Sequence, residues 1–154
     1  MAKHSSLTVE ESKRRIIYAT GDWWIRYIPQ PDMDGCGPAC LAMLLDVPYE
    51  HARVMLGGDQ RNADFIDMGK LLRRNGYLSA WSLHYGEGRS WPPHIFAPVM
   101  LWQISDPPHW VIVGGEEIVF DPAKPAVRNV RELKRAYPKF DIDYAGGVWP
   151  FGSA

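Results

Sequence analysis

The chain has 154 residues, of which 46% are hydrophobic and 23% charged, and its formal net charge is −1. These values are typical of a globular protein with one core, and the near-zero net charge provides no overall basic field that would attract nucleic acid or anionic lipid. No apolar run approaches the roughly 20 residues of a membrane-spanning helix, and the N-terminus lacks a secretory signal. We therefore expect a single cytoplasmic domain over residues 1–154 that binds neither nucleic acid nor a membrane.

The first elements in chain order are mainly helical. Residues 1–20 are expected to form an extension, in which a capping box at residues 8–11 starts a short polar helix that ends near Tyr18. Residues 23–28 are aromatic and β-branched, which predicts a short strand. Three helices should follow. The first starts in the Cys36 region and is buried all round, the second covers residues 49–56 and is closed by Gly57-Gly58, and the third runs from Asp64 to Asn75.

The second half carries mainly strand signals. Strands are predicted at residues 77–83, 97–104, 109–113 and 117–120, with a turn-rich loop at 86–94. Asn129 can cap one more short helix. Residues 141–154 are interpreted as a flexible, aromatic-rich C-terminal tail, in which Gly146-Gly147 is not taken as a self-cleavage site. Helices first and strands later predict an α+β fold with an antiparallel sheet packed on the Cys36 helix.

Cys36 lies where a polar loop turns into an apolar helix. Pro38 suits the first turn of a helix, because its missing N–H would be unpaired there anyway. Gly35 and Gly37 keep the preceding chain in a turn. The free N–H groups and the positive dipole at a helix start favour a thiolate, which is the reactive form of cysteine. Cys40, one turn further on, is expected to be a core residue.

A nucleophilic cysteine needs a base, and the base needs an orienting partner. The chain offers five histidines, of which only His109 has a partner that the sequence indicates; the other four are His4, His51, His84 and His94. In a hairpin with a three-residue loop centred on Gly115, His109 lies directly opposite Asp121, on the same face. Asp121 can then hold the imidazole tautomer and stabilise the imidazolium.

A second requirement is a donor for the oxyanion that forms during acyl transfer. The backbone N–H of Cys36 is one candidate, and the side-chain amide of Gln30, six residues earlier, is another. A zinc site is disfavoured, because Cys36, Cys40 and His109 lack the second close ligand pair that structural zinc sites normally have. We expect neither a metal nor a cofactor.

Gln30, the run Cys36-Gly37-Pro38-Ala39-Cys40, the stretch starting at His109-Trp110 and the motif Asp121-Pro122 occur in an order that resembles the bacteriocin-processing (double-glycine) peptidases. That family belongs to the papain-like cysteine peptidases. The resemblance implies a papain-like fold, a peptide or protein substrate, and Cys36 as nucleophile, His109 as base, Asp121 as orienter and Gln30 in the oxyanion hole.

Two features depart from the family pattern. Family members commonly precede a transporter, whereas this sequence shows neither a membrane span nor an ATPase, which predicts a free-standing relative. Gly35 stands where the family more often has Asp. Two alternatives to hydrolysis therefore stay open: a catalytically silent module that binds a peptide or partner, and an acyltransferase or deamidase that uses the same triad.

Overall fold

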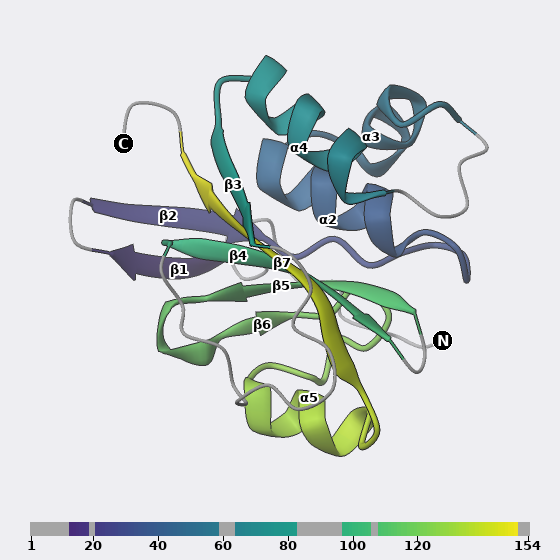
Figure 1. Ribbon diagram of the computed structural model, residues 1–154, viewed down its shortest axis with the longest axis vertical. Helices are drawn as coiled ribbons and strands as arrows, with labels where there is room; N and C mark the ends of the chain where they lie inside the picture. The colour runs from purple at the N-terminus through teal and green to yellow at the C-terminus, as the bar shows by residue number, and fades with distance from the viewer. Residues whose placement is uncertain (1–12, 19–20, 59–63, 83–96, 106–107, 151–154) are drawn as a thin grey trace, which may run out of the picture.

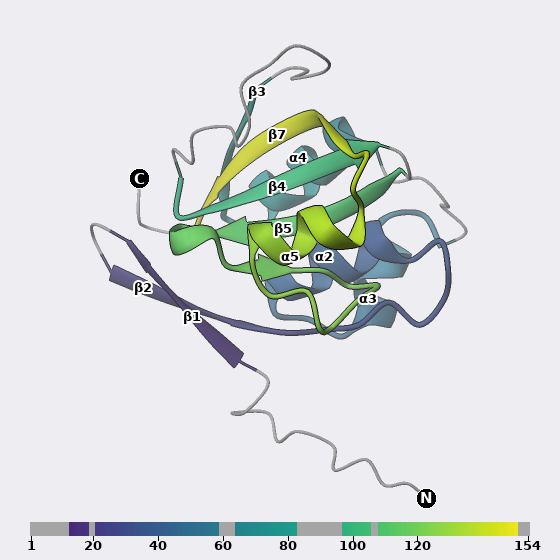
Figure 2. The ribbon, with the colours of Figure 1, turned by 90° about the horizontal axis from the view of Figure 1, so that it is seen from below.

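The computed structural model describes residues 13–18, 21–58, 64–82, 97–105 and 108–150. It has the expected α+β architecture: a five-stranded antiparallel sheet, a separate two-stranded hairpin, and helices on both faces of the larger sheet (Figure 1). Helices α2, α3 and α4 cover one face and α5 covers the other (Figure 2). Within the described ranges, no helix combines the length and the apolar composition needed to cross a membrane.

The larger sheet has the strand order β3-β7-β4-β5-β6. Every neighbouring pair in it is antiparallel. The strands are β3 (Leu78–Ser82), β4 (Val99–Ser105), β5 (His109–Gly114), β6 (Val119–Phe120) and β7 (Asp141–Trp149).

Side chains alternate along β4 and β5 between two hydrophobic clusters, as the period of a strand requires. Leu101 and Ile112 pack in the cluster formed with the helices α2, α3 and α4. Trp102 and Val111 pack in the cluster that includes residues of α5. All four side chains are fully buried. The sheet is therefore covered on both faces.

The helices begin and end close to the predicted positions. They are α2 (Cys36–Leu45), α3 (Tyr49–Met55), α4 (Phe65–Arg74) and α5 (Val130–Ala136). The Asp64 side chain caps α4 by accepting hydrogen bonds from two backbone N–H groups of its first turn. Asn129 caps α5 in the same way through the N–H of Glu132.

The predicted N-terminal helix is wrong over the residues that the structure describes. Residues 13–18 form β1 (Lys13–Tyr18), which pairs antiparallel with β2 (Gly21–Arg26). The capping box at residues 8–11 lies outside the described residues. Strand formation is explained by burial, since pairing places the side chains of Ile16 and Ile25 in the main core at 0% exposure. This tertiary contact outweighs a local capping signal.

The β1–β2 hairpin is fastened to the edge of the larger sheet. The Arg14 guanidinium donates a hydrogen bond to the backbone oxygen of Val119 at 2.6 Å and lies 4.8 Å from the Phe120 ring centroid. Ile16 packs against Gly114, where an added Cβ would lie 2.5 Å from the Ile16 Cδ1 atom. Glycine at 114 therefore allows the hairpin to approach β5 closely.

The interpretation of residues 141–154 as a flexible tail is wrong for residues 141–149. These residues form β7, which pairs with β3 on one side and β4 on the other. Gly146 and Gly147 are buried within this strand, which leaves no exposed backbone for self-cleavage. Glycine is depleted in strands in general, which is why the composition of this segment concealed an interior strand.

Candidate active site

Cys36 is the first residue of α2, as predicted. Its side chain is partly exposed, whereas the following residues of the helix are buried. The residue before it, Gly35, has no side chain and so provides no side-chain cap. The first N–H groups of a helix have no partner within the helix. The thiol therefore lies beside uncapped backbone donors and the positive end of the helix dipole.

Gly35 is crowded by a residue that sequence reasoning missed. A Cβ atom at position 35 would lie 2.5 Å from the Tyr49 hydroxyl and 3.3 Å from the Gln30 Cβ. Tyr49 belongs to α3, and its hydroxyl fills the space that a side chain at position 35 would need. No signal near Cys36 in the sequence indicates this contact, because it depends on how α3 packs.

His109 and Asp121 are brought together by the structure. The His109 Nε2 atom lies 2.7 Å from the Asp121 Oδ1 atom, a hydrogen-bond distance. The His109 side chain is 7% exposed and that of Asp121 is 0% exposed. Such a short contact shielded from water holds the imidazole ring in one orientation.

The predicted strand register between these two residues is wrong, although both lie on the same face. The pairs Ile112↔Phe120 and Val113↔Val119 place Asp121 opposite Val111, so His109 is its diagonal neighbour. The hairpin loop has three residues as predicted, Gly115–Glu117, but it is centred on Glu116. Glu116 and the next residue adopt positive φ angles of 61°. Moving the centre of the hairpin loop by one residue shifts the strand pairing by two residues. His109 and Asp121 therefore still point to the same face of the sheet.

Two tyrosines that sequence reasoning missed also bind Asp121. The Tyr137 hydroxyl donates to the carboxylate Oδ2 at 2.8 Å, and the Tyr27 hydroxyl donates to the backbone oxygen at 2.6 Å. The backbone N–H of Ala123 donates to Oδ1 at 2.9 Å. Asp121 is therefore held by donors from β5, from its own turn, from the end of α5 and from the segment after β2.

Cys36 lies close enough to the His109 ring to influence the pKa of that ring. Since Nε2 faces Asp121, Nδ1 is the ring nitrogen left for the thiol. Burial lowers the pKa of His109, but the hydrogen bonds and charges of Asp121 and Cys36 outweigh it and raise the pKa to about 9. At neutral pH the imidazole is therefore protonated and can stabilise a thiolate on Cys36.

Cys40 is a core residue, as predicted. Its side chain is fully buried in the main core. Burial, together with nearby Cys36 and Asp121, raises the pKa of the Cys40 thiol well above its ordinary value. A buried, protonated thiol is a poor nucleophile.

Gln30 lies beside the site, but its amide bonds to its own loop. Its Nε2 group donates to the backbone oxygens of Asp32 at 2.8 Å and Met33 at 3.3 Å. Its Oε1 atom is buried and has no hydrogen-bond partner among the described residues. The Gln30 N–H donates to the Pro122 oxygen at 2.9 Å, which fastens this loop to the turn that carries Asp121.

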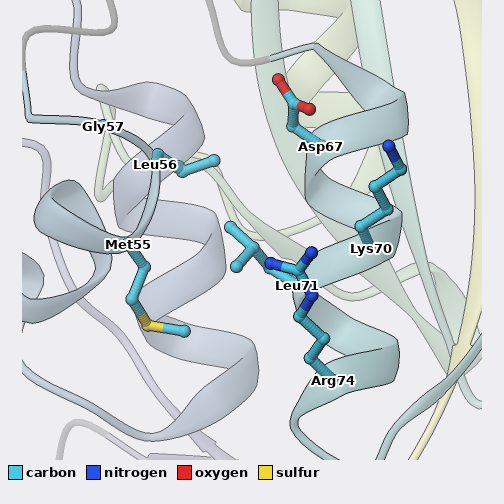
Figure 3. Close-up of a pocket in the computed structure, with 7 residues that line it drawn as sticks. All are labelled: Met55, Leu56, Gly57, Asp67, Lys70, Leu71 and Arg74. Carbon is cyan, nitrogen blue, oxygen red and sulfur yellow. The ribbon is translucent and has the colours of Figure 1, made fainter.

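Other features of the described chain lie apart from these residues. His51 is exposed on α3, and His4, His84 and His94 lie outside the described residues. A cavity of about 310 Å³ opens between the end of α3 and the α4 side chains Asp67, Lys70 and Arg74 (Figure 3). None of Cys36, His109, Asp121 or Gln30 lines this cavity.

The contrast between the two thiols predicts selective alkylation. Iodoacetamide at pH 7 should modify Cys36 at least about 100-fold faster than Cys40, since Cys40 reacts only after local unfolding. Peptide mapping by mass spectrometry after timed quenching measures both rates. Equal rates at both thiols would show that Cys36 is not activated.

No protein-family model matches the sequence, and no curated protein does. Solved structures match the fold. A double glycine motif protease from an AMS/PCAT transporter, in complex with the leader peptide, superposes with a TM-score of 0.59 at 23% identity, over 82% of this chain and 91% of that one.

Two further matches are peptidase domains of ComA, a bi-functional ABC transporter involved in quorum sensing in Streptococcus. The Streptococcus ComA domain gives a TM-score of 0.58 at 17% identity, over 80% of this chain and 97% of that one. The Streptococcus mutans ComA domain gives 0.54 at 17% identity, over 80% and 98%. The chain therefore has the papain-like fold of double-glycine peptidase domains, as the sequence resemblance implied.

Proposed function

We propose that this protein is a cysteine peptidase that hydrolyses a peptide or protein substrate. The observation that carries the proposal is the buried hydrogen bond between Asp121 and His109, with Cys36, at the N-terminus of α2, near enough to influence the pKa of His109. We assign Cys36, His109 and Asp121 the roles of nucleophile, base and orienter, which are the groups that thiol-dependent acyl transfer needs. The peptidase domains of similar fold support the same chemistry.

In the proposed reaction the Cys36 thiolate attacks the carbonyl carbon of the scissile bond. The backbone N–H of Cys36 stabilises the oxyanion, because Gly35 leaves the first turn of α2 uncapped. His109 then protonates the leaving amine, and a thioester remains on Cys36. A water molecule deprotonated by His109 attacks the thioester and releases the acid product.

Gln30 is the proposed second oxyanion donor, and it must change its hydrogen bonds to act. Its N–H groups point to the Asp32 and Met33 oxygens, while its Oε1 atom is buried and has no partner within the described part of the chain. A buried oxygen without a hydrogen bond destabilises a structure by about 1–3 kcal/mol. The observed orientation of the Gln30 amide is therefore not its most favourable one. Substrate entry is proposed to turn the amide toward the oxyanion.

The proposed substrate is a peptide with a double-glycine motif, since one structure of similar fold is a double glycine motif protease bound to a leader peptide.

The proposed location is the cytoplasm. Both described cysteines are free thiols, and free thiols are maintained in a reducing compartment such as the cytoplasm.

The test is incubation with double-glycine peptides and with a random peptide library, followed by mass spectrometry. Hydrolysis yields two fragments and, after acid quenching, a thioester on Cys36. Deamidation would give a one-dalton shift without a backbone cut, and acyl transfer would give a product joined to an added amine. Binding without any product would identify a silent recognition module and would refute the peptidase proposal.

A further inference from the structure

The two oxygens of the Asp121 carboxylate have different partners. Oδ1 accepts hydrogen bonds from His109 Nε2 and from the backbone N–H of Ala123. Oδ2 accepts one from the Tyr137 hydroxyl at 2.8 Å. The carboxylate is fully buried, so water does not supply a substitute for a missing donor. An ionised buried carboxylate is stable only when its oxygens are satisfied.

Tyr137 is itself held in place from several sides. It follows α5, the helix that lies in front of the sheet in Figure 2, and its N–H donates to the Leu133 oxygen at 2.9 Å. Its ring centroid lies 5.5 Å from that of His109, and the Lys124 Nζ atom lies 4.9 Å from the ring centroid. These contacts keep the hydroxyl aimed at Oδ2.

We propose that Tyr137 is a positioning residue of the active site, whose hydroxyl holds the Asp121 carboxylate turned toward His109. The inference rests on the proposed function, because it assigns Tyr137 a role in the same site. Tyr137 acts through Asp121 and is not assigned any contact with substrate.

The proposed role follows from what hydrogen bonds do to charged groups. A donor to a carboxylate favours its ionised form, and an ionised Asp121 in turn favours the protonated imidazole. Burial and the neighbouring Asp121 charge raise the pKa of Tyr137, so its hydroxyl remains a donor across the pH range of interest. Without that hydroxyl, Oδ2 would be buried and would lose its partner, and the carboxylate would be free to turn away from His109.

The ionisable groups around His109 and Asp121 come from three parts of the fold: the segment after β2, helix α2 and the end of α5. Tyr27, Cys40 and Tyr137 lie within electrostatic range of Asp121. Cys36 and Asp121 are the groups that raise the pKa of His109. Burial and Asp121 raise the pKa of Tyr27, and burial raises that of Cys40, so both stay neutral while His109 titrates.

The decisive experiment measures the His109 pKa by NMR of the imidazole carbons and nitrogens in the full chain, without substrate. In Tyr137→Phe we expect this pKa to fall by at least about half a unit, because a carboxylate that is free to turn away from His109 supports the imidazolium less. An unchanged or higher pKa would overturn the proposal. Since no turnover is needed, this readout is independent of whether the protein is a peptidase.

Tyr27→Phe is the matched control. It removes the same hydroxyl from the same residue type, but the lost hydrogen bond ends on the Asp121 backbone oxygen and not on the carboxylate. The His109 pKa should therefore move less in Tyr27→Phe than in Tyr137→Phe. Equal shifts would show a general loosening of the site and would refute the specific role. If Tyr137→Phe does not fold, Tyr137→Met removes the hydroxyl and refills the space with a flexible apolar chain.

With a cleaved peptide in hand, Tyr137→Phe should lower kcat about tenfold and leave KM within about twofold, as expected when one oriented hydrogen bond in the catalytic unit is lost. A rise in KM at constant kcat would place Tyr137 in substrate binding and would contradict the positioning role.

Discussion

Cys36→Ala is expected to lower peptide turnover by about 10⁴-fold or more, since removal of a nucleophile eliminates the covalent step and leaves only oxyanion stabilisation and binding. The substitution is mild for the fold, because the Cys36 side chain is partly exposed at the start of α2. The measurement is initial rate against substrate concentration, together with a thermal melt of each variant.

Cys40→Ala is the matched control for this variant. It makes the same substitution one helical turn away, at a fully buried thiol, and should retain turnover. Peptide binding by Cys36→Ala, measured by calorimetry, should persist at near wild-type affinity. Turnover that survived in Cys36→Ala would exclude the thiol mechanism, whatever the fold.

The free energy of unfolding is expected to fall as the pH rises from 6.5 to 9. The His109 pKa is raised from 6.5 to about 9 in the folded protein. A group whose pKa is raised by folding contributes stability that is complete below its unfolded pKa and lost as the pH passes its folded pKa. The full contribution is about 3 kcal/mol, of which about 2 kcal/mol should disappear between pH 6.5 and 8.5.

Urea titrations at half-unit pH steps measure this dependence, and the slope over this window is the quantity to compare. His109→Gln removes the titrating group and should flatten the profile. Asp121→Asn removes the charge that raises the His109 pKa and should reduce the slope, although it keeps the shape of the side chain. A wild-type profile that was flat from pH 6.5 to 8.5 would mean that no stabilised imidazolium exists in the folded protein.

Local signals predicted the helical half of the fold well. Pro38 in a first turn, Asp64 as a cap and the Gly57-Gly58 pair after α3 each act within a few residues, and each marked a helix end that the structure has. The glycines at 57 and 58 adopt φ angles of 98° and 76°, which side-chain-bearing residues rarely do. Such signals need no knowledge of the tertiary structure.

Features that depend on distant partners were mispredicted or missed. Strand β1 exists because it pairs with β2 and buries Ile16, and β7 exists because β3 and β4 flank it. The contacts of Tyr49 and Tyr137 with the site likewise join separate elements. None of these partners is indicated by the residues adjacent to it in the chain.

The pairing of His109 with Asp121 was predicted only in part. The loop length was right and its centre was one residue off, so the two side chains meet diagonally instead of face to face. Side chains two residues apart on a strand point to the same face, so the two residues still meet despite this error. The roles of Cys36, His109, Asp121 and Gln30 remain proposals that the experiments above decide.

The position of β7 constrains how the protein can be made. Strands β4, β5 and β6 are close in the chain and can pair by short connections, whereas β3 joins the sheet only through β7, the last described strand. During synthesis the N-terminal part emerges first, and pairing over long separations is slow. The sheet therefore cannot be completed until residue 149 has left the ribosome, and β3 must wait as an unpaired edge until then.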